Sequence, residues 1–275
     1  EEVTALHEHE WLHGISSSVE LRGRHISANR YVPMILPDGR SLHGINDASI
    51  RIGLRLSKDE TIVRMPFEVR HMGSKYPIFS FDFTGAKRGV LPASYDYLRL
   101  EGRMQYRLNL PPIGYSQLML EGGKIFGKVS YLLLKLHEGN GTYFYDRYAF
   151  SCMNFYEFSS DAWISFFYEH HFNGFLLGRV PLLKKLNWRE VFVFKGVYGT
   201  LSARNDGSLP NTKAVMLFPV GMSSVEHPYL ETGFGIENIF RLLRVDCIWR
   251  LTHHRAVPGL SIPTFTVNFI LNLKF

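Results

Sequence analysis

Apolar and polar residues alternate one by one over long stretches of this chain, and this period of two limits its fold more than any other feature. In residues 265–275 one face carries Phe265, Phe269 and Leu271 among other apolar side chains, while the other face is mainly polar. Successive side chains of a β-strand point to opposite faces, so the pattern predicts a strand with one apolar face. Because the same pattern recurs along the chain, we predict an all-β, antiparallel fold.

We predict about twelve strands from this alternation. They cover residues 12–26, 49–57, 61–70, 78–86, 95–110, 114–124, 148–158, 162–173, 188–202, 228–238, 242–253 and 265–275. Most span roughly 8 to 15 residues, whereas a strand of a soluble globular protein usually has about 5–6. Strands of about 9–11 residues, tilted by about 45°, are long enough to cross a bilayer. The sequence therefore favours an up-and-down transmembrane β-barrel over the alternative, a soluble β-sandwich.

The composition agrees with a single barrel domain that covers residues 1–275. The 21 Phe, 14 Tyr and 24 Gly favour strands and turns. No run of about 18 apolar residues is present, which argues against a transmembrane helix. The net charge of +6 is spread along the predicted strands. This spread argues against a nucleic-acid partner. We predict that Cys152 and Cys247 are small apolar fillers and do not form a disulfide.

The connections between the predicted strands differ in length. Residues 27–48, 203–227 and 254–264 are long and polar, and we expect them at the outer end of the barrel. Short connections, such as 57–60 and 239–241, are expected at the inner end. Residues 125–147 and 174–187 are also expected there, although both are long. The second of these, with Leu182, Leu183, Lys184 and Lys185, could form a short amphipathic helix. Pro66, within a predicted strand, requires a bulge, an edge or a strand break.

The polar face of each strand lines the lumen if the fold is a barrel, because a charged group in hydrocarbon would cost about 2–4 kcal/mol. The residues predicted to line the lumen are Arg51, Arg55, Arg64, Arg70, Arg99, Glu101, Arg103, Arg107, Arg244, Asp246 and Arg250. These arginines could form the surface of an anion-selective pore. Alternatively, arginines and carboxylates pair and brace the lumen. Carboxylates nearly balance the arginines, which favours the braced lumen.

The histidines do not form a convincing catalytic or metal site. His7, His9 and His13 match no standard metal spacing and are interpreted as part of a solvated segment. His171 shares a strand face with Glu169, which would suit a hydrolase. Ser165 lies on that face, but about 20 Å along the strand, too far for contact. We therefore predict no enzyme activity, no metal and no cofactor, and keep a barrel hydrolase only as an alternative.

Three stretches resemble one family of outer-membrane proteins. They are residues 139–205, which begin GNGTYFYDRYAF, residues 227–254, which begin HPYLETGFGIEN, and the closing FTVNFILNLKF. They are similar to the C-terminal barrel of Gram-negative proteins that join a carboxypeptidase-regulatory-like β-sandwich to a barrel like that of the surface-antigen assembly factors. The resemblance covers roughly residues 95–275. It implies a 16-stranded barrel and a preceding sandwich domain, so the chain is expected to be a C-terminal fragment.

The assembly-factor barrels carry an Arg-Gly pair in a loop that folds into the lumen. We identify no convincing equivalent; Asp146-Arg147-Tyr148 is the nearest candidate. This difference argues against insertase or secretion activity.

The final strand suggests how the protein reaches its membrane. The alternating Phe265, Phe269, Leu271, Leu273 and Phe275 match the signal by which barrel-assembly machinery recognises its substrates. The expected location is the bacterial outer membrane, with outer-membrane lipid, lipopolysaccharide and the assembly machinery as partners. The leading hypothesis is a protein of transport or envelope biogenesis with an Arg-rich lumen. The alternative is a structural anchor for a surface or periplasmic domain.

Overall fold

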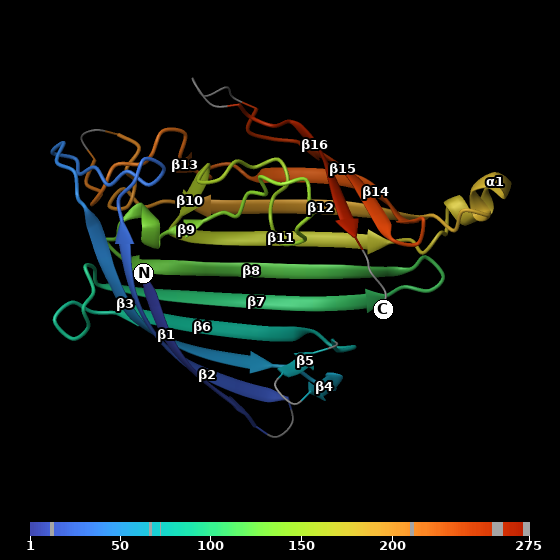
Figure 1. The fold of residues 1–275 in the computed structure, drawn as a ribbon, viewed down its shortest axis with the longest axis horizontal. Helices are drawn as coiled ribbons and strands as arrows, with labels where there is room; N and C mark the ends of the chain where they lie inside the picture. The colour runs from blue at the N-terminus through green and yellow to red at the C-terminus, as the bar shows by residue number, and fades with distance from the viewer. Residues whose placement is uncertain (12–13, 66–67, 72, 210–211, 255–260, 272–275) are drawn as a thin grey trace.

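The computed structural model describes residues 1–11, 14–65, 68–71, 73–209, 212–254 and 261–271. Within these ranges, eleven strands form one antiparallel sheet in which each strand pairs with the next sheet strand along the chain (Figure 1). These strands are β1 (Glu2–Glu10), β2 (Ile15–Ser27), β3 (Gly44–Leu56), β6 (Ile78–Ala86), β7 (Tyr97–Asn109), β8 (Tyr115–Gly127), β11 (Ala162–His171), β12 (Arg189–Thr200), β14 (Tyr229–Ile239), β15 (Leu243–Arg250) and β16 (Phe265–Leu271). The predicted all-β, antiparallel, up-and-down fold is confirmed.

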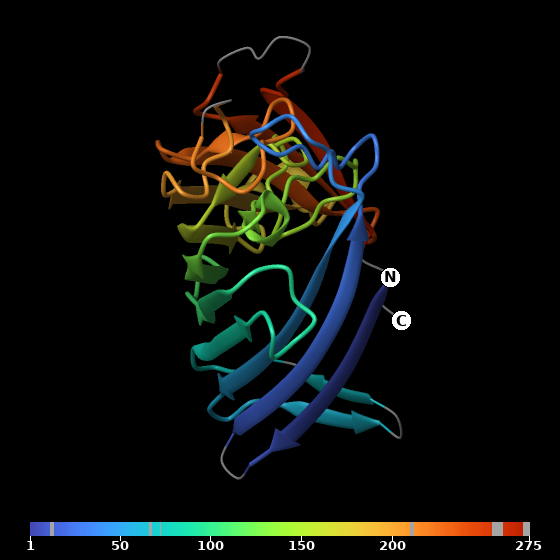
Figure 2. The same ribbon diagram turned by 90° about the vertical axis from the view of Figure 1, so that its left-hand side faces the viewer.

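The sheet curls round a central space, with β1 and β16 as its two ends (Figure 2). Among the described residues, β1 pairs with β2 alone, and β16 pairs with β15 and with a short segment around Phe144. The register is regular over most of the sheet; for example, Gly235 lies opposite Asp246. The main sheet is therefore a strongly curved open barrel wall.

Two predicted strands are wrong. Residues 61–70 form the hairpin of β4 (Ile62–Met65) and β5 (Glu68–His71), which is a separate two-stranded sheet. A proline cannot donate a ladder hydrogen bond, which disfavours one continuous strand here; Pro66 itself lies outside the described residues. Residues 148–158 belong to the connection between β8 and β11, where the five consecutive residues 149–153 are buried and no strand forms before Phe158.

One strand of the main sheet is missing from the prediction. Residues 2–10 form β1, whose side chains are all exposed. Because this strand carries His and Glu in alternation, it has little apolar signal, and the segment was interpreted as solvated. Backbone pairing with β2, for example between His7 and Val19, fixes it in the sheet. His13 lies outside the described residues.

The long connections meet at one end of the sheet because successive strands run in opposite directions. They comprise residues 28–43, 87–96, 128–161, 201–228 and 251–264, and they include β9 (Lys135–Leu136), β10 (Phe158–Ser160) and β13 (Ser223–Ser224). The predicted placement of 125–147 at the opposite end is wrong. That placement assumed that 148–158 is a strand that carries the chain from one end of the sheet to the other, and no main-sheet strand lies between β8 and β11. The opposite end carries the β4–β5 hairpin and α1 (Pro181–Lys184), the short helix expected within 174–187 (Figure 1).

Connections pack against the concave side of the sheet and form the core. Phe150, Met153 and Phe158 from the β8–β11 connection contact strand residues such as Phe167 and Tyr229. A second cluster closes the long-connection end, where Met34, Tyr131 and Met216 from three different connections pack around Trp163. We call the strand face that carries Phe167 and Tyr229 the inner face.

The outer face of the same strands is apolar and exposed. Its large exposed side chains include Ile52, Leu54, Phe81, Phe83, Leu98, Ile164, Phe234, Trp249 and Phe265. An apolar surface this extensive is unusual for a soluble monomer. No helix formed by the described residues is long and apolar enough to span a membrane.

Candidate functional site: an inner loop held by buried charges

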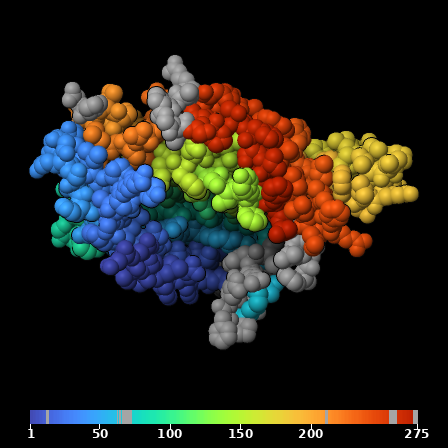
Figure 3. Space-filling view, turned by 45° about the horizontal axis from the view of Figure 1, so that its top comes forward, coloured from blue at the N-terminus to red at the C-terminus, as the bar shows by residue number. Residues whose placement is uncertain are grey.

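The connection from β8 to β11 contains a segment that lies against the inner face of the sheet. We call residues 137–157 the inner loop. It contacts β11, β12, β14 and β15, whereas the inner face of β1–β3 and β6–β7 faces a hollow (Figure 3). The loop is attached to these strands mainly by buried charged groups, which are described in turn.

Glu169 on β11 is the first attachment point. Its side chain is 2% exposed and accepts a hydrogen bond from the Tyr145 hydroxyl. The Arg147 Nε donates to Glu169 Oε2 at 3.0 Å. The guanidinium of Arg244, on β15, lies 3.4 Å from the other carboxylate oxygen. Glu169 therefore joins two strands to the Asp146-Arg147-Tyr148 segment, which the sequence identified only as the nearest match to a lumen-loop motif.

Glu231 on β14 is the second attachment point and is fully buried. Its carboxylate accepts hydrogen bonds from the backbone N–H groups of Ser151 at 2.8 Å and Cys152 at 2.7 Å. It also accepts one from the Tyr229 hydroxyl at 2.7 Å. Hydrogen bonds to an ionised acceptor are among the stronger ones in proteins. Glu231 therefore fixes the backbone of the inner loop rather than a side chain.

Two cations on the strands that flank β14 complete the attachment. Lys195 on β12 donates from Nζ to the carbonyl oxygens of Asp146 at 2.9 Å and Ala149 at 2.6 Å. Arg250 on β15 forms a two-pronged pair with Glu157, with contacts of 2.6 and 3.2 Å. Removing one member of such a buried pair typically costs about 3–5 kcal/mol, because the other charge is left without a partner.

The start of the inner loop also reaches the free edge of β16. Tyr145 donates its backbone N–H to the Phe269 carbonyl at 3.0 Å, and Phe269 donates to the Tyr143 carbonyl at 2.7 Å. The Asn268 side chain donates to the Thr142 carbonyl at 3.1 Å. Residues 142–145 thus cover part of the edge that β16 would otherwise expose.

Burial changes the chemistry of two loop side chains. Burial raises the pKa of the Cys152 thiol to about 12, and the nearby Glu231 carboxylate adds to this effect. Cys152 is therefore a poor nucleophile while the loop is docked. Burial lowers the pKa of His137 to about 3, and the neighbouring Lys135 acts in the same direction. His137 is neutral in the folded protein, with Nε2 2.9 Å from Ser160 Oγ.

The predicted lumen residues fall into three groups in the structure. Arg244, Asp246 and Arg250 belong to the buried network around the inner loop. A second group lies along the inner face of the N-terminal half, where four arginines form the ion pairs Arg51–Asp82, Arg55–Glu60, Arg99–Glu101 and Arg103–Glu121. Arg107 stacks over the Tyr115 ring at 4.0 Å. Arg64 and Arg70 lie in the β4–β5 hairpin, and their side chains are outside the described part of the chain.

The residues of the proposed assembly signal lie on the outer face of β16 as far as they are described. Phe265, Phe269 and Leu271 are exposed there. Leu273 and Phe275 lie outside the described residues. Cys152 and Cys247 are both free thiols, as predicted.

The residues proposed for a hydrolase are not brought together. His171 bonds through Nδ1 to Glu237 at 3.1 Å and lies 3.4 Å from Glu169, and no contact joins it to Ser165. A different serine, Ser116, lies 2.8 Å from His170, whose other ring nitrogen contacts the Ile113 carbonyl rather than a carboxylate. Within the described ranges, no group of His, Cys, Asp and Glu side chains is arranged to hold a metal ion.

Sequence reasoning missed Lys195, Tyr145 and Glu157 as part of the site. Lys195 had a readable signal, because it is a charge between Val193 and Val197 on one face of its strand. Tyr145 and Glu157 had none, since they lie in a connection whose path depends on the fold. The two carboxylates that hold the loop, Glu169 and Glu231, do lie on the predicted polar faces.

Comparisons with known proteins agree with the architecture. A family model described as "Family of unknown function (DUF5686) C-terminal domain" matches residues 21–203. No curated protein matches the chain. Among solved structures, BamA from Haemophilus ducreyi lacking POTRA domains 1–3 is similar, with a TM-score of 0.53 and 10% sequence identity. The match covers 94% of this chain and 52% of that chain, so this chain spans about half of its length. At this identity the likeness shows the fold, that of an outer-membrane-type β-barrel.

Proposed function

The chain belongs to the family of unknown function DUF5686, whose C-terminal domain it contains, and we propose that it acts in envelope biogenesis as an outer-membrane barrel with the inner loop docked in its lumen. The exposed apolar face of the curved sheet supports the membrane location, because such a face is suited to lipid. The similarity to the BamA structure supports the same location and the same broad class of process.

The observation that carries the proposal is the docking of the inner loop by Glu169, Glu231 and Arg250. A permanently open pore does not need a segment held in its lumen by several buried ion pairs. A protein that changes between a closed and an open lumen does need such a segment. Its paired charges give two discrete arrangements, one with the loop docked and one with the loop released. The docked loop therefore favours a gated role over free diffusion of solutes.

Pairing of the arginines also disfavours a simple anion pore. Arg51, Arg99 and Arg103 each lie within 2.8 Å of a carboxylate oxygen, so their charge is largely balanced. Transport remains the second candidate function, because a cavity of about 480 Å³ lies on the inner face beside Arg51 and Arg55. In that case the inner loop would have to move before a solute could pass.

A structural anchor and a hydrolase are further alternatives. An anchor needs only the outer apolar face and would tolerate loss of the loop contacts. A hydrolase would need a serine beside His171, and that histidine is instead held between two carboxylates. We therefore propose a non-enzymatic role.

The test is to replace the gene in its native host with variants of the full protein. We expect Glu169→Gln combined with Glu231→Gln to increase the sensitivity of the cells to detergent and to large antibiotics that an intact outer membrane excludes. Glu101→Gln is the matched control, since Glu101 pairs with Arg99 away from the loop. Normal sensitivity in the double variant, with normal protein levels, would favour the anchor instead.

Conductance in planar bilayers separates closed barrel from pore. The native protein is expected to show a low conductance that rises in the Glu169→Gln, Glu231→Gln variant. A steady, anion-selective native conductance that reverses when Arg99, Arg103 and Arg107 become Glu would contradict the proposal and support the pore.

A further inference from the structure

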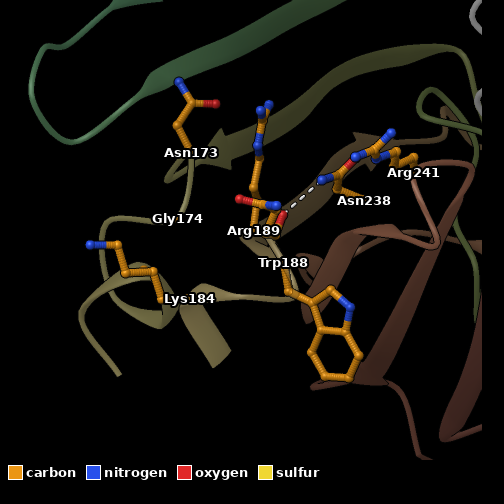
Figure 4. A pocket seen from close by; sticks show the side chains of 9 residues that line it. Asn173, Gly174, Lys184, Trp188, Arg189, Asn238 and Arg241 are labelled. Atoms are coloured by element: carbon orange, nitrogen blue, oxygen red, sulfur yellow. Dashed lines mark hydrogen bonds between the residues drawn. The ribbon is translucent and has the colours of Figure 1, made fainter. Parts of the chain in front are cut away.

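The end of the sheet opposite the long connections carries a basic cavity that the proposed function does not use. The cavity has a volume of about 480 Å³ and lies between α1 and the ends of β12 and β14. Its nine lining residues include Lys184, Arg189 and Arg241 and no carboxylate. Figure 4 shows Asn173 and the Arg189 guanidinium pointing the same way and Trp188 pointing the opposite way.

The three cations are not neutralised by ion pairs. None of them has a carboxylate oxygen within 4.0 Å among the described residues. Glu237 lies opposite Arg189 in the β12–β14 pairing, but its carboxylate bonds His171 at 3.1 Å, and the carboxylate of Glu190 accepts the backbone N–H of Leu177. The cavity is therefore a concentration of positive charge, and its complement is an anion.

Exposed apolar side chains surround this charge. Leu182 is 83% exposed and Phe240, the neighbour of Arg241, is 87% exposed. Leu176, Val180 and Leu186 are also exposed. The segment 172–189 contains four Lys or Arg residues and no Asp or Glu. Basic residues next to exposed apolar ones are the composition of segments that lie in a membrane interface.

We propose that this cavity binds the phosphate of an anionic phospholipid headgroup, while Leu182 and Phe240 enter the adjacent acyl region. The inference rests on the membrane location of the proposed function. A lipid fits better than a free phosphate ion, because a free ion would not account for the apolar side chains around the cavity. The amide groups of Asn173 and Asn187 add hydrogen-bonding capacity beside the cations.

The test uses the full chain, reconstituted in phosphatidylcholine bilayers that contain a small fraction of spin-labelled phosphatidylglycerol. We compare the native protein with Lys184→Gln, Arg189→Gln, Arg241→Gln. Each cation near an anionic surface contributes about fivefold in affinity, so the triple variant should lose on the order of 100-fold in its preference for phosphatidylglycerol. The matched control is Lys128→Gln, Arg204→Gln, Lys213→Gln, which removes the same charge from exposed side chains at the opposite end.

The outcomes are distinct. Loss of the preference in the cavity variant but not in the control supports the proposal. Equal loss in both variants shows attraction to net charge and overturns it, as does an unchanged cavity variant. Displacement of the lipid by millimolar inorganic phosphate would identify a free-anion site and also overturn it. Failure of the native chain to insert into bilayers would refute the membrane location itself, and with it the proposed function.

Discussion

Replacement of Glu231 by Gln should release the inner loop, and Cys152 provides a direct readout. Cys152 donates its backbone N–H to Glu231 and is fully buried while the loop is docked, so a reagent in solution cannot reach its thiol. A Cys247→Ser background leaves it as the only cysteine of the chain. A maleimide that reacts with Cys152 then reports the fraction of molecules in which the loop has opened.

The magnitude follows from the contacts of Glu231. Its carboxylate accepts three hydrogen bonds, from Ser151, Cys152 and Tyr229. A hydrogen bond to a charged group is worth about 1 kcal/mol more than one to a neutral group. Loss of the charge weakens the two bonds to the inner loop and should therefore weaken docking by about 1–3 kcal/mol. The labelling rate should rise roughly 5- to 140-fold, since 1.4 kcal/mol corresponds to about tenfold.

A graded series makes the test specific. Tyr229→Phe removes the hydrogen bond within β14 and leaves both bonds to the inner loop in place, so it should raise the labelling rate less than Glu231→Gln does. Glu101→Gln, in the other half of the sheet, should leave the rate unchanged. Strand content by circular dichroism and heat-shifted migration on gels check that the barrel stays folded. A Glu231→Gln rate within twofold of the native rate, in a folded protein, would refute the role of the buried carboxylate.

Three further perturbations follow from the structure. Gly235→Ala should lower the free energy of unfolding in urea by about 1–3 kcal/mol, because its Cβ would lie 1.8 Å from Asp246 Oδ1. The control Gly85→Ala adds a Cβ that meets no atom within 4 Å and should have little effect. Lowering the pH from about 6.5 toward 3 should raise the labelling rate of Cys152 relative to that of a free thiol at the same pH, because the pKa of His137 is about 3 when folded and the unfolded segment binds the proton more readily across that window; a His137→Gln variant that kept the full acid effect on this ratio would show that another group is responsible. Phe81→Arg, on the exposed outer face, should destabilise the protein in bilayers by about 2–4 kcal/mol, and Ser80→Arg, on the inner face, should not; equal effects in guanidinium unfolding from vesicles would contradict the assignment of the two faces.

Period-two alternation was enough to predict the sheet apart from β1, because most of its strands have one apolar and one mainly polar face; β12, which carries Val191, Phe192, Val193 and Phe194 in succession, is the exception. β1 was missed since both of its faces are polar or mixed, and only pairing with β2 fixes it. The pattern failed at 148–158 for the opposite reason. Phe150 and Cys152 alternate there with other residues because the inner loop packs against the sheet, not because it is a strand.

The candidate site was only partly predictable. Strand charges such as Glu169, Arg244 and Arg250 could be assigned to the inner face from the alternation, since every second residue of a strand points to the same face. Their partners could not, because Tyr145 and Glu157 come from the connection 128–161, whose path is set by tertiary contacts. Pairing across such a distance in sequence leaves no local pattern.

The most direct test of the central claim is a disulfide between the inner loop and β16. Phe144 and Phe269 form a backbone bridge in the structure. In a chain without Cys152 and Cys247, expressed in the outer membrane, Phe144→Cys with Phe269→Cys should cross-link on mild oxidation. The control is Phe144→Cys with Phe265→Cys. Residue 265 lies four residues before residue 269, about 13 Å along the strand, which puts it beyond the reach of a disulfide to residue 144. Rapid cross-linking of the first pair alone is the predicted result, and equal cross-linking of both pairs, or of neither, would contradict a docked inner loop.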